Sequence, residues 1–388
     1  METSLRRTWA EIDLNALEHN YHQLRSVIGA HTKFMGIVKA DAYGHGAVQI
    51  SRELERLGVD YLAVSSLDEA QELRENGIQS PILILGYTPP LMTGRLLEYN
   101  ITQTVTSEEI AIQYNHAAQA NGGILKVHIK ADTGMSRLGF LIAPTCLERS
   151  VNEIYRSCQL PHLLAEGIFT HFAASDEDDE KSEEYTRKQF ASFIAVLEAL
   201  QKNGQYFQIK HCANSGAVAR YPEMYLDIVR PGIELYGVGI DAERLNLKPV
   251  MSLKSNVSTI KDVDAGTDIS YGRTFTTQNK SRIGVIPIGY ADGLMRGLSN
   301  QLNVHTPDGM APIRGRICMD MTMIDLSYLP DIVEGTEVEI FGQQQRVDNV
   351  AKLLGTISYE LVCAVSKRVP RLYIKDQVMI ERVLRILS

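Results

Sequence analysis

Short apolar runs alternate with amphipathic helical patterns through the first 240 residues, and this alternation constrains the fold most. Helical spacing of apolar residues follows the runs, as in 47–57 and 108–118. Strands that are joined by helices pair in parallel, so the pattern predicts a parallel sheet flanked by helices. The strand-length runs occur at 34–38, 61–64, 82–85, 102–105, 125–129, 167–170, 207–211 and 226–229.

About eight strands within about 240 residues fit the size of an α/β fold of the (β/α)8 TIM-type barrel class. A doubly wound open sheet has the same alternation and is the structural alternative. The pattern changes after Gly239, where short β-rich runs such as 251–263 are separated by Gly, Pro and Asp, with one helical stretch near 350–354. We therefore expect a barrel domain over 1–240 and a mainly β domain over 241–388.

Charge and composition exclude several classes of partner. The chain has 39 Lys and Arg against 47 Asp and Glu, a formal net charge of −8, and no basic tract that would bind nucleic acid. No apolar run approaches the roughly 18 residues of a membrane span, and no apolar signal region follows the charged N-terminus. A cytoplasmic protein with no membrane association is expected.

Metal and disulfide sites are not expected either. The five cysteines are scattered and include no C-x-x-C pair, which argues against a zinc site and a disulfide framework. The acidic stretch 176–180 lacks the spacing of a calcium loop and is interpreted as a solvated loop.

Polar residues that end predicted strands are the candidates for function, because active sites of barrels lie at the C-terminal ends of the strands. A lysine desolvated at a barrel mouth can form a Schiff base, which is the hypothesis for Lys39. Glycine-rich segments at 44–46 and 230–237 offer backbone N–H groups to a phosphate, without the third glycine of a dinucleotide fingerprint. A phosphorylated cofactor is therefore expected. The strand-end candidates are Lys39, Lys130, His171, Asn214, Ser215 and Arg230.

A series of motifs resembles the alanine racemases, a family of pyridoxal-phosphate enzymes, from about Thr8 to Tyr373. The order and the spacing of the motifs along the whole chain carry the resemblance. They are Val38-Lys-Ala-Asp-Ala-Tyr-Gly-His-Gly, Lys130-Ala-Asp-Thr-Gly-Met-Ser-Arg-Leu-Gly, Thr170-His-Phe-Ala-Ala-Ser-Asp, Asn214-Ser, Arg230-Pro-Gly-Ile-Glu-Leu-Tyr-Gly, Ser270-Tyr-Gly, Gly289-Tyr-Ala-Asp-Gly, Cys318-Met-Asp and Ile357-Ser-Tyr-Glu.

The resemblance implies a bacterial-type isomerase that interconverts L-alanine and D-alanine through an aldimine with pyridoxal phosphate and supplies D-alanine for peptidoglycan. It also implies a head-to-tail homodimer, in which the β domain of each subunit completes the active site of the other. Racemisation needs two acid/base groups on opposite faces of the substrate. By motif match these are Lys39 and, from the partner subunit, Tyr271, with His171 and Arg230 as the neighbours that favour its phenolate.

The resemblance also assigns cofactor and substrate residues. Arg230 faces the pyridine nitrogen of the cofactor, Arg137 and the partner's Met319 bind the substrate carboxylate, and Tyr290 narrows the entrance together with Tyr359. Lys130 matches a lysine that is carbamylated in many relatives and then holds Arg137. The cofactor residues are Lys39, Tyr43, His171, Asn214, Ser215, Arg230, Gly232, Ile233 and Tyr359.

Other functions remain open at this point. A racemase with a preference for serine or with broad specificity shares all these motifs, and a pyridoxal-phosphate amino-acid decarboxylase shares the lysine and the β domain. The motifs Gly289-Tyr-Ala-Asp-Gly and Cys318-Met-Asp favour the racemase over the decarboxylase. A non-enzymatic cofactor-binding protein would need only the barrel. The sequence leaves open whether the role is biosynthetic or catabolic.

Overall fold

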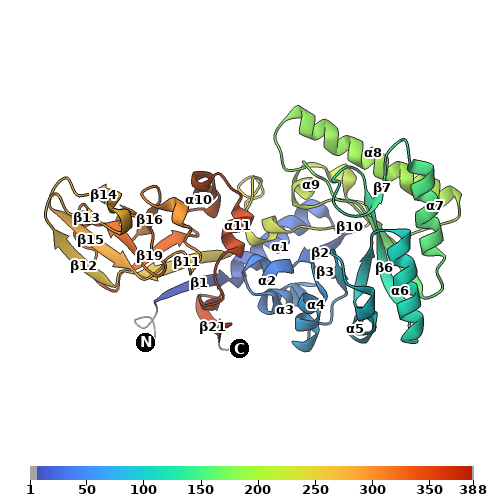
Figure 1. Cartoon of the computed structure of the whole chain (residues 1–388), viewed down its shortest axis with the longest axis horizontal. Coiled ribbons are helices and arrows are strands. Elements are labelled where there is room, and N and C mark those ends of the chain that lie inside the picture. The colour runs from blue at the N-terminus through green and yellow to red at the C-terminus, as the bar shows by residue number, and fades with distance from the viewer. Residues whose placement is uncertain (1–6, 387–388) are drawn as a thin grey trace.

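The computed structural model describes residues 7–386 and contains a barrel with helices around it and an elongated, mainly β part (Figure 1). Within these residues, eight parallel strands form the barrel in the order β10-β2-β3-β4-β5-β6-β8-β9. They are β2 (Lys33–Ile37), β3 (Tyr61–Val64), β4 (Ile82–Ile84), β5 (Thr102–Val105), β6 (Leu125–Asp132), β8 (Leu163–Phe169), β9 (Ile209–His211) and β10 (Ile228–Val229).

Backbone hydrogen bonds close the barrel between its last two strands. The amide of Asp227 donates to the carbonyl of Lys210 at 3.0 Å, and the amide of Arg230 donates to the carbonyl of Ala213 at 2.9 Å. The barrel fold expected from the alternation is therefore confirmed, and the open doubly wound sheet is excluded.

Helices cover the outside of the barrel and bury an apolar stripe against it. The first helix begins at Leu14, where the Asp13 side chain accepts hydrogen bonds from the amides of Asn15 and Ala16 and caps the helix. The barrel helices are α1 (Leu14–Ile28), α3 (Ala47–Leu57), α4 (Leu67–Glu75), α5 (Thr93–Glu98), α6 (Glu108–Ala120), α7 (Leu147–Cys158), α8 (Glu180–Lys202) and α9 (Ser215–Arg220). The short segment α2 (Lys39–Tyr43) is not a right-handed helix, because its residues after Lys39 have positive φ angles.

The β part contains a seven-stranded sheet in the order β17-β16-β19-β11-β1-β20-β21, a three-stranded sheet β12-β15-β18 and the hairpin β13-β14. Its strands after the barrel are β11 (Met251–Asn256), β12 (Thr259–Val263), β13 (Asp268–Ile269), β14 (Phe275–Thr276), β15 (Ser281–Ile286), β16 (Asn303–Thr306), β17 (Gly309–Pro312), β18 (Thr322–Asp325), β19 (Glu337–Phe341), β20 (Arg371–Lys375) and β21 (Val378–Val383).

The N-terminal strand β1 (Thr8–Asp13) belongs to the seven-stranded sheet, where it lies between β11 and β20. From β1 in the β part, the chain therefore crosses to the barrel through α1 and returns to the β part after the barrel, at β11. No periodicity in the sequence predicts this placement, because the paired residues of β1 in β11 and β20 lie at least 239 positions away.

Three local expectations need correction. The run 251–263 is two strands, β11 and β12, and not one. The β part has two helices, α10 (Val347–Leu354) and α11 (Ser358–Cys363), where the pattern predicts one, because six residues are too few to show helical periodicity. Helix α7 was also missed, although Val151 and Ile154 have helical spacing. Among residues 7–386, no helix is both long and apolar enough to span a membrane.

Candidate active site

A cavity of about 110 Å³ lies at the C-terminal ends of the barrel strands and collects the nine residues expected to bind the cofactor. Helix α11 of the β part also reaches this cavity through Tyr359. Asp176, Ile37 and Leu85 line it as well and were not anticipated, since two of them are ordinary strand residues and Asp176 lies in the acidic loop. The nine expected residues are Lys39, Tyr43, His171, Asn214, Ser215, Arg230, Gly232, Ile233 and Tyr359.

The residues that follow Lys39 form a left-handed turn. Ala40, Asp41, Ala42 and Tyr43 have φ angles of 52°, 55°, 52° and 53°. Left-handed helical backbone costs about 1–2 kcal/mol for each L-residue, so such a turn persists only where its surroundings hold it. The turn places Lys39 and Tyr43 in the wall of one cavity.

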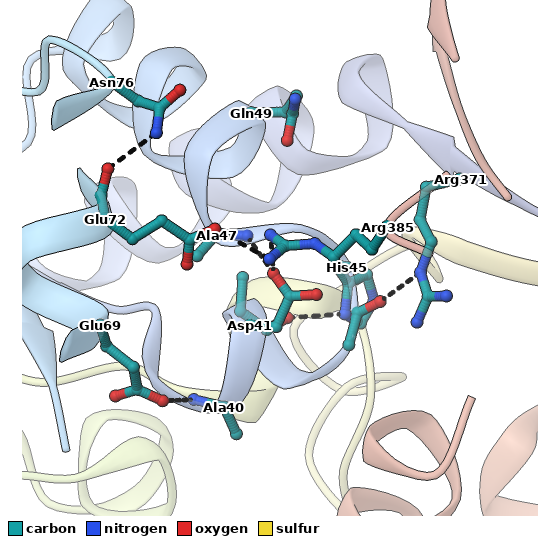
Figure 2. Close-up of polar contacts among 12 residues, drawn as sticks. Ala40, Asp41, His45, Ala47, Gln49, Glu69, Glu72, Asn76, Arg371 and Arg385 are labelled. Atoms are coloured by element: carbon teal, nitrogen blue, oxygen red, sulfur yellow. Dashed lines mark hydrogen bonds and ion pairs between the residues drawn. The ribbon is translucent and has the colours of Figure 1, made fainter. Parts of the chain in front are cut away.

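Hydrogen bonds from two helices hold this turn (Figure 2). The amide of Ala40 donates to the Glu69 carboxylate at 2.7 Å, and Glu69 also closes the capping box at the start of α4. The carboxylate of Asp41 accepts from the amide of Ala47 at 2.8 Å, and the Asp41 carbonyl accepts from the amide of Gly46 at 2.9 Å. The turn is thereby connected to α4 on one side and to α3 on the other.

Burial and nearby cations favour the neutral amine of Lys39. Burial lowers its pKa most, and the positive charges of Arg137 and, more weakly, Arg230 lower the pKa further against the opposing charge of Glu69. A neutral amine is the form that attacks a carbonyl group or accepts a proton. Lys39 is therefore suited to nucleophilic and basic chemistry.

Arg230 is a buried cation that is surrounded by neutral acceptors. Its Nη1 donates to Nδ1 of His211 at 2.9 Å, and its Nη2 contacts Nδ1 of His171 at 3.1 Å and the carbonyls of Thr170 and Cys212 at 2.9 and 3.1 Å. Burial lowers its pKa to about 10, so the guanidinium stays protonated at neutral pH. Burial and the Arg230 charge lower the pKa of both histidines well below the usual value, which keeps both imidazoles neutral.

A chain of buried polar groups continues from Arg230 into the barrel. Because a guanidinium can only donate, Nδ1 of His211 accepts, and its Nε2 donates to Nδ1 of His128 at 2.9 Å. Nε2 of His128 then faces the Glu166 carboxylate at 3.5 Å, which also accepts hydrogen bonds from Tyr61 and Thr102 at 3.0 Å each. The sequence did not predict His128, His211 and Glu166 as part of this chain, because a histidine inside an apolar strand does not indicate which residue is its hydrogen-bond partner.

Hydroxyls and backbone amides suited to a phosphate lie together in the cavity. The rings of Tyr43 and Tyr359 are 5.8 Å apart, and the amide of Gly232 donates to Oγ of Ser215 at 2.8 Å. A Cβ at Gly232 would lie 2.8 Å from the Tyr43 hydroxyl and would fill this space. The donor set contains Ser and Tyr hydroxyls and backbone amides, and it fits the phosphate of pyridoxal phosphate.

Lys130 lies beside the cavity, and the surroundings of its amine differ from those of the Lys39 amine. Its amine donates to the carbonyl of Ala131 at 3.3 Å and lies 5.0 Å from the centre of the Phe169 ring. Burial, followed by the charge of Arg230, lowers its pKa to about 7. Arg137 is exposed on the loop after β6, and its charge acts on both Lys39 and Lys130.

Tyr271, Met319 and Tyr290 do not line the cavity. Tyr271 is 71% exposed in η5 (Tyr271–Arg273), which connects β13 to β14 at the end of the β part remote from the barrel (Figure 1). It borders a separate hollow of about 490 Å³ together with Met319 and Cys318. A single chain thus keeps the two expected bases in different places.

Comparisons with known proteins agree over the whole chain. Two family models match, "Alanine racemase, N-terminal domain" over residues 12–239 and "Alanine racemase, C-terminal domain" over residues 250–373. Alanine racemase of Desulforamulus reducens is 45% identical over 371 residues, which cover 94% of this chain and 98% of the relative. That of Clostridium tetani is 44% identical over 381 residues, 96% of either chain.

Solved structures of alanine racemases also match this chain over nearly its whole length. Alanine racemase of Clostridium difficile 630 has a TM-score of 0.94 at 41% identity, covering 98% of this chain and 99% of that chain. The Bacillus anthracis enzyme with bound L-Ala-P has a TM-score of 0.90 at 33% identity, covering 98% of each chain.

Replacing Gly44 by alanine should destabilise the protein through a clash with α11. Gly44 ends the left-handed turn at φ 80°, and a Cβ there would overlap the backbone carbonyl of Val362. Gly58→Ala is the matched control, because Gly58 has φ 86° and open space around it. We expect a loss in the free energy of unfolding of about 1 kcal/mol for Gly58→Ala and about 2 kcal/mol more for Gly44→Ala, measured by urea denaturation. Equal losses in the free energy of unfolding for the two variants would contradict a clash at Gly44.

Proposed function

The chain belongs to the alanine racemase family of pyridoxal-phosphate isomerases, and we propose that it interconverts L-alanine and D-alanine with Lys39 and Tyr271 as its two bases. The observation that carries the proposal is the single cavity in which Lys39, Arg230 and the phosphate-binding hydroxyls meet. Bound pyridoxal phosphate supplies the electron sink that makes the Cα proton of the substrate acidic.

Lys39 binds the cofactor covalently through its amine and then moves the Cα proton on one face of the substrate. The lowered pKa of Lys39 supports both roles, since a larger fraction of the amine is neutral at a given pH. The left-handed turn behind Lys39 limits where this amine can lie.

Arg230 would present a fixed positive charge to the ring nitrogen of bound pyridoxal phosphate. A guanidinium with a pKa of about 10 has no proton to give at neutral pH, so it leaves that nitrogen unprotonated. His171 and His211 are neutral and accept hydrogen bonds from Arg230, which orients its guanidinium plane. We propose that a bound cofactor with an unprotonated ring would withdraw electrons more weakly, which would favour return of the proton to the substrate over transamination.

Tyr271 of a partner subunit serves the opposite face in a head-to-tail homodimer. The exposure of Tyr271 and Met319 in a hollow apart from the cavity supports this arrangement, because neither side chain reaches Lys39 in its own chain. Arg137 and the partner's Met319 bind the substrate carboxylate, and a guanidinium is the group that binds a carboxylate with two parallel hydrogen bonds.

Tyr290 and Tyr359 narrow the entrance, which favours the small side chain of alanine and rejects serine poorly. A cytoplasmic location is also proposed, supported by the five free cysteines, which are in the thiol form typical of that compartment. The D-alanine produced there supplies peptidoglycan.

The proposed reaction is tested by incubating the purified protein with L-alanine, L-serine and L-lysine in separate assays. We expect D-alanine to form faster than D-serine by only about tenfold to a hundredfold, because sterics alone reject one hydroxyl group weakly. Chiral chromatography measures the enantiomers, and a CO₂ assay runs in parallel. Release of CO₂ without a D-amino acid would refute the racemase, and faster conversion of serine would refute the alanine preference.

Shared active sites predict complementation between two inactive variants. Lys39→Ala and Tyr271→Phe each damage every site of their own homodimer, whereas a mixed dimer contains one site without either change. Randomly mixed subunits should therefore recover up to about a quarter of the wild-type activity. Mixing must follow dissociation and reassociation, and Lys39→Ala treated alone is the control. No recovery, with mixed dimers demonstrated by differently tagged subunits, would contradict the head-to-tail arrangement.

Lys130 should react with CO₂. With a pKa of about 7, its amine becomes neutral as the pH rises through 7, and the neutral nitrogen adds to CO₂ and releases a proton, which leaves an anionic carbamate beside Arg137 and Arg230. We expect a carbamate signal in ¹³C NMR with labelled bicarbonate that grows with pH. Lys130→Ala should lack the signal and Lys126→Ala, on the same strand, should retain it. A signal in Lys130→Ala would contradict the assignment.

A further inference from the structure

We propose that Arg385, close to the C-terminal end of the chain, is a positioning residue for Lys39 and acts by holding the carboxylate of Asp41 in the left-handed turn. The inference rests on the proposed function only in taking Lys39 as the residue that binds the cofactor. It concerns the attachment of the lysine-bearing turn to the rest of the molecule.

Arg385 follows β21 and connects two elements of the barrel (Figure 2). Its Nη2 donates to Oδ1 of Asp41 at 2.5 Å, and its Nη1 donates to Oε1 of Glu72 in α4 at 2.8 Å. The two carboxylates thus share one guanidinium, whose planar fork fixes the directions of both hydrogen bonds. The end of the β part is thereby joined to the residue two positions after Lys39.

The carboxylate of Asp41 is the group through which this contact acts. The same Oδ1 accepts the amide hydrogen bond of Ala47, so it joins the turn to the first residue of α3. Burial raises the pKa of Asp41, and the charge of Arg385 opposes that rise more than any other group. Without Arg385, the negative charge of the buried Asp41 carboxylate would lose the positive charge that compensates it most. The carboxylate would then stabilise the turn less.

The far end of the turn has a separate attachment. Nε of Arg371 in β20 donates to the carbonyl of Gly44 at 3.0 Å, and the hydroxyl of Tyr373 donates to the carbonyl of His45 at 3.0 Å. Both side chains are buried, and neither contact involves Arg385. After loss of Arg385, β20 should therefore stay packed against the barrel, and only the part of the turn next to Lys39 should become looser. In that part the hydrogen bond from the Ala40 amide to Glu69 remains.

The test compares Arg385→Gln with Arg382→Gln, a substitution at an exposed arginine on β21. Apoprotein is titrated with pyridoxal phosphate, and the affinity, the absorption maximum of the bound cofactor and the free energy of unfolding are measured. Arg385→Gln should bind the cofactor about tenfold more weakly and shift the absorption maximum, because the hold on Asp41 is lost. Arg382→Gln should behave as the wild type, and Arg385→Lys should restore part of the affinity. Unchanged affinity and absorption in Arg385→Gln would overturn the proposal, whatever happens to unfolding.

Asp41→Asn provides a second, independent arm. The amide retains an oxygen for the Ala47 amide but removes the charge that Arg385 binds. The effects of Arg385→Gln and Asp41→Asn on cofactor affinity should be strongly non-additive, because both remove one interaction. Additive effects would overturn the proposal. Lys39→Ala separates the proposed function from the proposed role of Arg385. An unchanged absorption band of the cofactor in Lys39→Ala would refute the role of Lys39. Wild-type cofactor affinity in Arg385→Gln would refute only the role of Arg385.

Discussion

A buried guanidinium at the mouth of the barrel sets the electrostatics of the site. Burial lowers the pKa of Arg230 only to about 10, so its charge persists in a place where water cannot screen it. Its partners are imidazole nitrogens and backbone carbonyls, which accept hydrogen bonds without neutralising the charge. That charge adds to burial in lowering the pKa of five nearby groups, Lys39, Lys130, His128, His171 and His211. One fixed cation therefore favours the neutral forms of the bases around it.

The β part of the chain supplies expected site residues at two separate places. Through α11 it places Tyr359 against Tyr43 in the cavity of its own barrel. At its other end it presents Tyr271 and Met319 in an exposed hollow, remote from that cavity. In one chain the cavity and this hollow are therefore separate. In the proposed head-to-tail dimer, the Tyr271 and Met319 of each chain would complete the cavity of the other, and this would explain why a large β domain accompanies the barrel.

The position of Lys39 depends on contacts that span the chain. Four successive residues in left-handed backbone cannot stabilise themselves, because each non-glycine residue there is less stable than in a right-handed helix. The contacts that hold the turn come from Glu69 nearby in sequence and from Arg371 and Arg385, the latter 344 positions from Asp41. The turn is therefore complete only once the C-terminal strands have packed against the barrel, so the geometry of the lysine is a property of the whole fold.

The sequence by itself determined the barrel and the composition of the cavity. Strands such as Tyr61–Val64 and Thr102–Val105 have the predicted bounds, because a short strand-forming run and the helix after it are local signals. Eight of the nine expected residues share a cavity because parallel strands bring the segments at their C-terminal ends together, whereas Tyr359 reaches it from α11 of the β part. Only the tertiary structure decided that β1 joins the second sheet, that His128 and His211 form a chain from Arg230 to Glu166, and that the turn behind Lys39 is left-handed. Each of these depends on partners distant in sequence, and periodicity describes only a segment and its immediate neighbours.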